Sequence, residues 1–589
     1  MATVHLSPGV FLCLRSSPLF IVLFSVFWIL RRVLGQRIDS VSSSWPILVA
    51  PWVGLLIVSL GRNYFISRAV TRHVAERGAI IPPSIQENRI SVSRRLVHGF
   101  EIGCPLDIIH AWSEEYGYTY SYTSILDKSV VTMEPEHLKA ILSTQHHDFP
   151  KGDDFFSMTE SLLGTGIFNS DGDIWKSRRA MLRPLFNKER ISDLDIFERH
   201  TSSALTQIEK RLREGYPVDV QDAAARFTID TATEHLCGKD VGSTSAQFPY
   251  PPGSQQKISL PLDNHPSDSF LRASSEAQRQ LLLRVLMGPY WPLREFFTDK
   301  LKPLRKVINE FFEPLLVDTL ERKSRGTNAP NVEKDEKEFV SLLDRLVQST
   351  NDKKSIQDGL VDILIAGRDT TASLITFAVY MMCEHPEMVS RLRSEVIAKV
   401  GARKPTSDDI RDMKYLRAFL NETLRLYPPV MSNIRTTEVA TTLPNKGGAP
   451  YYIPEGSRVM FIHFLMHRRT DLWGPDALEF DPDRFLDERL GKYLTPNPSI
   501  FLPFSVGPRI CMGQQFAYNE ASYFLIRLLQ KYLSFSLVLD AQAAKKSPPN
   551  IGPAKTAAPM GGDKIAFTPF TAILSVKDGL WVRMEESIE

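Results

Sequence analysis

A short stretch near the C-terminus places a single cysteine between two glycines. Residues 504–517 read FSVGPRICMGQQFA, with Arg509 two positions before Cys511 and with Gly507 and Gly513 on either side. Directly after this loop, apolar residues recur at the spacing of a packed helix: Ala517, Ala521, Phe524, Leu525, Leu528, Leu529 and Tyr532. We therefore expect Cys511 at a helix N-terminus, where backbone N–H groups and the helix dipole stabilise a thiolate.

The alternative for a lone cysteine is a buried structural role in a turn. Five fixed positions argue against it here, because Phe504, Gly507, Arg509, Cys511 and Gly513 match the pattern F-x-x-G-x-R-x-C-x-G. With this loop the chain resembles the cytochrome P450 family of haem-thiolate monooxygenases. The resemblance implies that Cys511 ligates the iron of haem b and that the other four residues bind the cofactor.

Composition excludes several other classes of protein. The 589 residues are 43% hydrophobic and 23% charged, as in ordinary globular proteins, and the net charge of +2 comes without a basic run that would indicate nucleic-acid binding. The five cysteines are odd in number and contain no C-x-x-C. This pattern argues against a disulfide scaffold or a zinc site and for a reducing compartment.

Two apolar segments open the chain, at residues 18–30 and 45–60, and the first reaches 20 residues only if it is extended back to Phe11 across Arg15. There is no basic n-region and no clear cleavage site, so we expect a retained membrane anchor over residues 1–61. Arginines after the second segment place the remainder, residues 62–589, on the cytoplasmic side. One spanning segment with an interfacial partner and a two-span hairpin both remain open.

Trp175 and Arg179 lie four residues apart and share a face if the segment is helical. A guanidinium and an indole N–H aimed together suit carboxylates such as haem propionates. The pair matches the family's W-x-x-x-R, so both are expected to bind the cofactor. The neighbouring cations Lys176, Arg178 and Arg183 are expected on an exposed basic face.

Residues 360–382 form an almost wholly apolar run, typical of a helix through the centre of a large domain. Buried polar residues within such a helix need a reason, and a threonine can bond back to the i−4 carbonyl and bend it. Residues 366–371 match the family's A-G-x-D/E-T-T. The resemblance implies that Asp369 and Thr370 relay protons to bound dioxygen, with Thr371 structural.

Glu422 and Arg425 are three apart on a segment that stops at two prolines, and taken alone they would be a trivial surface ion pair. The family pairs this E-x-x-R with a later arginine, here Arg484 in FDPDRF. By resemblance the three form a structural clamp behind the haem. Arg435 occupies a place where family members often contact a propionate.

We expect a mainly α protein with small β-sheets. Strands are predicted within residues 119–125 and 129–133, a helix pair over residues 270–286 and 301–322, a linker over residues 325–337 and a mobile loop after Ala541. The final segment, residues 567–584, has the pattern of a β-hairpin that turns at residues 577–579. By resemblance, the tip of this hairpin lines the substrate pocket.

Four motifs thus occur in the family's order, and we expect a membrane-bound monooxygenase at the endoplasmic reticulum that inserts one atom of O2 into a C–H bond. No G-x-G-x-x-G or flavin segment is present, so an NADPH-cytochrome P450 reductase, with cytochrome b5 as a further donor, is the implied partner. The runs around residues 171–186 and 422–448 resemble the fungal branch that hydroxylates alkanes and fatty acids. By that alignment Met431, Ser432, Asn433 and Ile434 face the pocket.

Other interpretations stay open. The lipophilic substrate could instead be an aromatic hydrocarbon or a secondary metabolite. Beyond hydroxylation, the alternatives are a haem-thiolate isomerase or dehydratase, and a non-catalytic haem-binding membrane protein.

Overall fold

The computed structural model describes residues 7–12, 25, 61, 64–102, 105–125, 128–192, 194–255, 265–324, 341–544, 563–569 and 571–586. Apart from positions 11, 12 and 25, the expected anchor segments, residues 11–30 and 45–60, lie outside these ranges. The predicted linker over residues 325–337 and most of the loop after Ala541 do so as well. Within the described ranges, no helix combines the length and apolar character needed to cross a membrane.

The described chain is mainly helical, as the sequence predicts, and a helix over residues 64–76 precedes its body. The principal helices are α3 (Arg89–Glu101), α4 (Pro105–Tyr116), α6 (Asp153–Leu163), α7 (Gly172–Leu182), α9 (Asp195–Arg213), α10 (Val220–Cys237), α12 (Pro266–Met287), α13 (Leu301–Ser324), α14 (Leu342–Ser349), α15 (Lys353–Glu384), α16 (Pro386–Lys399), α18 (Lys414–Leu426) and α21 (Gln514–Lys531). Shorter helices are α5 (Pro135–Lys139), α8 (Lys188–Ile191), α17 (Ser407–Asp412), α19 (His463–Met466) and α20 (Thr470–Trp473).

Three small sheets accompany the helices. The largest has the strand order β1 (Thr119–Thr123), β2 (Lys128–Thr132), β7 (Arg458–Phe461) and β4 (Asn433–Thr436), with β2 and β7 parallel and the other neighbours antiparallel. The second has the order β3 (Val218–Asp219), β9 (Trp581–Glu586) and β8 (Tyr532–Leu537), and the third pairs β5 (Thr441–Leu443) with β6 (Tyr451–Ile453). β1 and β2 confirm the two strands predicted in this region.

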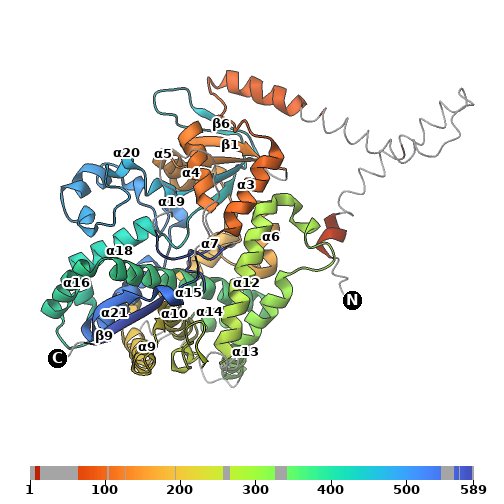
Figure 1. Cartoon of the computed structure of the whole chain (residues 1–589). Helices are drawn as coiled ribbons and strands as arrows, with labels where there is room; N and C mark the ends of the chain where they lie inside the picture. Colours follow the sequence, from red (N-terminus) through yellow and green to blue (C-terminus); the bar gives the residue numbers. More distant parts are fainter. Residues whose placement is uncertain are drawn as a thin grey trace, which may run out of the picture.

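Helix α15 runs through the middle of the molecule, between the β1 and β6 region and the helices α9 and α21 (Figure 1). Its first half packs in one hydrophobic cluster through residues such as Ile356 and Leu364, and its second half packs in another through residues such as Leu374 and Phe377. Residues 366–371, which carry the polar motif, lie between these two halves. The helix therefore presents its polar motif where the two cores meet.

The C-terminal hairpin prediction is wrong in its pairing, although its turn is placed correctly. Asp578 and Gly579 have φ values of 60° and 94°, the left-handed conformation that a tight turn needs. However, β9 pairs with β8 and β3, and the preceding run closes on itself through a single bridge between Phe567 and Val576. In its sheet β9 pairs with a strand on each side, β3 and β8, whereas a hairpin would give it one partner.

Candidate functional site

The cysteine loop has the local structure that its sequence predicts. A short 3-10 turn over Gly507–Arg509 leads to Cys511, whose backbone N–H donates to Phe504 O at 3.0 Å, and α21 begins three residues later with Gly513 as its N-cap. Burial raises the pKa of the Cys511 thiol, whereas the Gly513 N–H and the guanidinium of Arg179 act in the opposite direction. The surroundings therefore contain the donors that favour a thiolate.

Cys511 lines an internal cavity of about 300 Å³ between α7, α10, α15, β4 and the cysteine loop. Most of its lining side chains are apolar. Of the ten residues expected to bind the haem or to relay protons, eight line this cavity: Trp175, Arg179, Thr370, Arg435, Phe504, Arg509, Cys511 and Gly513. One chamber thus collects residues from motifs more than 300 positions apart in the chain.

Gly507 and Asp369 are not among the lining residues of this cavity. Gly507 has a φ of 76°, and a Cβ at this position would lie 2.0 Å from the carbonyl oxygen of Leu142. This glycine thus permits close packing between the cysteine loop and the backbone of residues 140–144, where even an alanine would collide. The contact shown at Gly507 is with protein rather than with the cavity.

Four cationic side chains converge on one part of the cavity wall: Lys151, Arg179, Arg435 and Arg509. Arg509 pairs with Asp171 and lies 4.5 Å from the ring centre of Trp175. Arg179 donates from both terminal nitrogens to Ile510 O at 3.1 Å. Two of the four cations thus have defined partners beside the cysteine.

Lys151 and Arg435 share a neutral acceptor, since both donate to Asn433 Oδ1, at 2.9 and 3.0 Å, and Arg435 also donates to Ile434 O at 2.8 Å. They are only 9% and 4% exposed. Burial lowers the pKa of Lys151 well below its usual range, and Arg435 and Arg509 lower it further. Burial, followed by repulsion from Arg509, lowers the pKa of Arg435 to about 9. This part of the wall would gain stability from an anionic partner.

These features fit a haem. A thiol on the wall supplies an iron ligand, and the apolar lining suits a porphyrin ring. Lys151, Arg435 and Arg509 have Asp171 as their one nearby anion within the described part of the chain, so this cationic wall suits two propionates. The residues that could hold the propionates are Trp175, Arg179, Arg435 and Arg509, and the structure adds Lys151.

Thr370 and Asp369 are turned to different sides of α15. Thr370 lines the cavity and donates from Oγ1 to Ala366 O at 2.7 Å, the i−4 bond that the sequence predicts. Asp369 is buried, and its carboxylate accepts from Gln278 Nε2 of α12 at 2.6 Å. Burial raises the pKa of Asp369, while Arg368 and Gln278 lower it. The carboxyl group of Asp369 therefore faces α12, on a different side of α15 from the cavity-lining hydroxyl of Thr370.

The predicted clamp is assembled and fully buried. Glu422 forms a bidentate pair with Arg425, at 2.6 and 2.7 Å, and Arg484 Nε lies 3.5 Å from Glu422 Oε1. Each of these three side chains is at most 1% exposed. Arg484 also pairs with Asp476, so the clamp links α18 to the segment of residues 476–485.

Sequence reasoning missed Lys151, and it misplaced Arg178. Lys151 lies in an irregular segment without periodicity, so no local signal marks it. Arg178, predicted on an exposed face, is partly buried and donates to Ser355 Oγ at 2.8 Å. Of the four residues expected to face the pocket from 431 to 434, Asn433 lines it.

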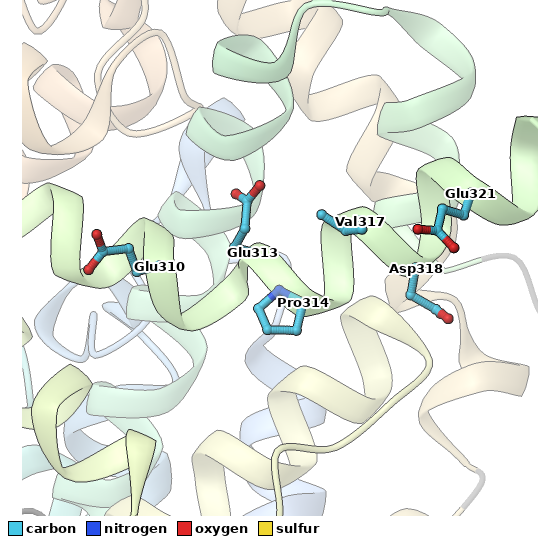
Figure 2. A pocket seen from close by; sticks show the side chains of 6 residues that line it. All are labelled: Glu310, Glu313, Pro314, Val317, Asp318 and Glu321. Carbon is cyan, nitrogen blue, oxygen red and sulfur yellow. The ribbon is translucent and has the colours of Figure 1, made fainter.

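A second, shallow hollow lies along α13 and is lined by acidic side chains (Figure 2). Glu313 pairs with Lys353, and Asp318 pairs with Lys239 at 2.9 Å and with Arg322 at 3.3 Å. These are ion pairs of an exposed helix face and leave the hollow without a distinct binding function.

Comparison with known proteins agrees with this geometry. The family model named Cytochrome P450 matches residues 97–552. Cytochrome P450 monooxygenase himC of Aspergillus japonicus is 36% identical over 420 residues, which cover 71% of this chain and 71% of that protein. Cytochrome P450 52A3-B of Candida maltosa is 36% identical over 438 residues, which cover 71% of this chain and 78% of that protein. Cytochrome P450 monooxygenase g430 of a Fusarium species is 32% identical over 512 residues, which cover 84% of this chain and 86% of that protein.

The family uses haem held by a cysteine thiolate, together with O2 and electrons that originate from NADPH. The mainly helical fold, the cavity beside Cys511 and these matches lead to one conclusion. This chain belongs to the cytochrome P450 family and is a monooxygenase.

Proposed function

We propose that Cys511 is the iron ligand and that Trp175, Lys151, Arg179, Arg435 and Arg509 hold the propionates. The observation that carries this proposal is the pair of buried cations, Lys151 and Arg435, which share one amide oxygen at the cavity wall. When bound, haem supplies the activation of dioxygen. The chain positions the reactants, keeps bulk water out of the cavity and delivers protons to it.

Protons would reach the cavity through the Asp369 and Thr370 pair. The Thr370 hydroxyl lines the cavity, and the carboxylate of Asp369 lies on the α12 side of the same helix. Such an arrangement moves a proton if the Asp369 carboxyl group breaks its hydrogen bond to Gln278, or if water connects that group to the Thr370 hydroxyl. The Glu422, Arg425 and Arg484 clamp would fix the fold around the cysteine loop rather than take part in the chemistry.

The proposed substrate is a long aliphatic chain, an alkane or a fatty acid, hydroxylated at or near its end. One oxygen atom enters the C–H bond, and the other is reduced to water with two electrons and two protons. The mostly apolar cavity lining supports a lipophilic substrate. The resemblance to the fungal alkane and fatty-acid branch and the similarity to Cytochrome P450 52A3-B support the aliphatic class.

We further propose that residues 1–61 anchor the enzyme in the endoplasmic reticulum membrane and that residues 62–589 form the catalytic domain on its cytoplasmic side. The two apolar segments and the arginines that follow them support this arrangement. Electrons would come from an NADPH-cytochrome P450 reductase in the same membrane, with cytochrome b5 as a further donor.

The test uses the purified, haem-loaded full chain with reductase. We expect the carbon monoxide difference spectrum of a thiolate-ligated haem and its loss in Cys511→Ser. A panel of an alkane, a fatty acid and an aromatic hydrocarbon is then scored by the shift of the haem spin state and by NADPH consumption. Failure of every aliphatic compound to shift the spin state would overturn the substrate class. Turnover without reductase would instead indicate an isomerase or dehydratase. If none of the compounds causes NADPH to be consumed, the result favours a non-catalytic haem protein.

A further inference from the structure

A histidine of α9 packs against the C-terminal part of α10, outside the cavity that Cys511 lines. The side chain of His200 is 5% exposed, and its Nε2 lies 2.7 Å from a carboxylate oxygen of Glu234. Because an ionised carboxylate only accepts, Nε2 carries the hydrogen of this bond. In the neutral ring, Nδ1 then has a free lone pair. The contact with Glu234 therefore decides which nitrogen of His200 is available to a ligand.

This free nitrogen faces two further carboxylates. His200 Nδ1 lies 3.9 Å from Asp230 Oδ2 and 3.9 Å from Asp240 Oδ2, and the three atoms lie within 4.8 Å of one another. Asp230 belongs to α10, and Asp240 follows Gly238, whose φ of 74° ends that helix. Among the described residues, no hydrogen bond reaches Nδ1. A buried nitrogen thus points without a hydrogen-bond partner into a cluster of possible metal ligands.

The separation of 3.9 Å is too long for a shared proton and suits a shared metal ion. A hydrogen bond between nitrogen and oxygen spans about 2.7–3.2 Å, so a proton on Nδ1 would bond neither carboxylate. An ion bonded at about 2.0–2.2 Å to each donor holds the donors about 3–4 Å apart. Without a cation, the Nδ1 lone pair faces two negatively charged oxygens. A metal ion between the three atoms removes this repulsion.

The charge balance around His200 also favours a divalent cation. Three carboxylates surround the ring, and Arg199 brings one positive charge by pairing with Glu234. Lys239, although next to the cluster in the chain, pairs with Asp318 of α13 at 2.9 Å. With a neutral imidazole, two negative charges stay uncompensated within this group. One divalent ion would neutralise them.

The two buried ligands are held in place by hydrogen bonds. The Asp230 carboxylate accepts from the N–H groups of Ser243 and Thr244, each at 2.7 Å, and from Thr244 Oγ1 at 2.8 Å. Metal-binding histidines commonly donate their other N–H to a carboxylate, as His200 does, which fixes the ring and makes the free nitrogen more basic. Asp240 has a side chain that is 49% exposed, so an ion can enter from solvent on its side.

We propose that His200, Asp230 and Asp240 bind one divalent transition-metal ion such as Zn²⁺. Imidazole nitrogen combined with carboxylate oxygen suits Zn²⁺ and related ions, whereas Mg²⁺ and Ca²⁺ prefer oxygen ligands alone. The ligands come from α9, α10 and the segment after α10, so the bound ion fastens these three segments together. None of the ligands lines the cavity, and binding of the ion requires neither haem nor the substrate proposed above.

The experiment titrates the haem-loaded full chain, first freed of metal by a chelator, with Zn²⁺ in the presence of a competing zinc indicator. We expect one tight site in the wild type. Asp240→Asn removes a ligand and should raise the dissociation constant of that site at least about tenfold. Glu234→Gln keeps an acceptor for the His200 ring but lowers its basicity, and it should raise the constant about tenfold. An equal concentration of Mg²⁺ should not displace Zn²⁺.

Asp318→Asn is the matched control. It removes the same charge from a side chain of similar exposure, 41% against 49% for Asp240, and Asp318 pairs with the neighbouring Lys239. Its Zn²⁺ affinity should stay within about twofold of the wild type. Equal affinity in the wild type and Asp240→Asn, or an equal loss in Asp318→Asn, would overturn the proposal. Displacement of Zn²⁺ by Mg²⁺ would overturn the assigned class of metal.

Thermal unfolding provides an independent measurement of the structural role. Zn²⁺ at about 100 times its dissociation constant should raise the unfolding midpoint of the wild type by about 2 °C, because the ion binds the folded chain. At the same Zn²⁺ concentration the midpoint of Asp240→Asn should rise no more than about half as far. The same rise in both proteins would show that the ion does not fasten these segments through Asp240. The exposed position of Asp240 keeps this comparison valid even if a variant of the buried His200 does not fold.

Discussion

The side-chain amide of Gln278 donates a 2.6 Å hydrogen bond to the carboxylate of Asp369 and so ties α12 to α15. On the other side of the carboxylate, Arg368 Nε lies 2.9 Å from its second oxygen. Successive residues of a helix point about 100° apart, as its 3.6-residue turn requires, so Asp369 contacts α12 while Thr370 lines the cavity. Two neighbours in one motif therefore occupy different environments.

This relationship predicts the effect of changing the acid. Asp369→Asn keeps an acceptor for Gln278 but cannot exchange a proton, so turnover should fall about 10²-fold or more. The carbon monoxide spectrum should remain that of a thiolate-ligated haem, because Cys511 is untouched. Unchanged NADPH-dependent turnover would show that protons reach the cavity by another route.

Gln278→Met removes the hydrogen bond that lowers the pKa of Asp369, and burial then raises that pKa further. The apparent pKa of turnover that belongs to Asp369 should move upward, and it should be missing from the profile of Asp369→Asn. A pH–rate profile of the three proteins checks this prediction. Identical profiles in the wild type and Gln278→Met would contradict it.

Lys151 should contribute to haem retention. Lys151→Met removes a buried cation, and because a hydrogen bond to a charged group is worth about 1.5–3 kcal/mol, haem transfer to an acceptor protein should accelerate roughly tenfold or more. Lys176→Met is the control, since Lys176 lies on α7 near the site but pairs with Asp173 in solvent. Equal transfer rates in the two variants would rule out a role for Lys151.

The clamp should be a major source of stability. Glu422→Gln leaves the guanidinium groups of Arg425 and Arg484 buried without their carboxylate partner, which should lower the free energy of unfolding by about 3–5 kcal/mol. The exposed pair of Arg411 and Asp408 provides the comparison, and Asp408→Asn should cost less than about 1 kcal/mol. Urea unfolding measures both, and a loss in Glu422→Gln no larger than in Asp408→Asn would contradict the prediction.

Glu520 should make stability depend on pH. It is 1% exposed, and burial raises its pKa from the ordinary value of 4.5 to about 8, although hydrogen bonds from Thr231 and Thr371 lower it. The folded chain therefore keeps a proton that the unfolded chain loses, and stability falls as pH rises from about 4.5 through 8.

Glu520→Gln removes this dependence. The variant should match the wild type near pH 4.5 and exceed it at pH 9 by about 2–4 kcal/mol in the free energy of unfolding. Unfolding curves across this pH range check the prediction. Parallel curves for the two proteins would show that Glu520 keeps its charge when folded.

Local features were predictable from the sequence. The helix before the two prolines ends at Leu426, the helix after the cysteine loop begins at Gln514, and the turn at Asp578 adopts positive φ. In each case the deciding interactions lie within a few residues: a proline ring, a cap or a turn. The motif order then indicated the family, and the matches with known proteins confirm it.

Features that depend on distant contacts were missed or misassigned. The pairing of β9 was wrong because β8 and β3 offered edges that its sequence neighbours do not reveal. Arg178 was expected in solvent, but the start of α15 covers it through Ser355. A helical wheel shows which residues share a face, and it does not show what packs against that face.

By itself, the sequence determined that this chain presents one cysteine at a helix N-terminus, with a central apolar helix interrupted by a polar motif, because both follow from short-range periodicity and turn chemistry. Only the tertiary structure decided that Lys151 meets Asn433 across 282 positions and that Asp362 holds the N–H of Phe168 across 194. Contacts of such separation depend on how whole elements pack, and no local pattern encodes them.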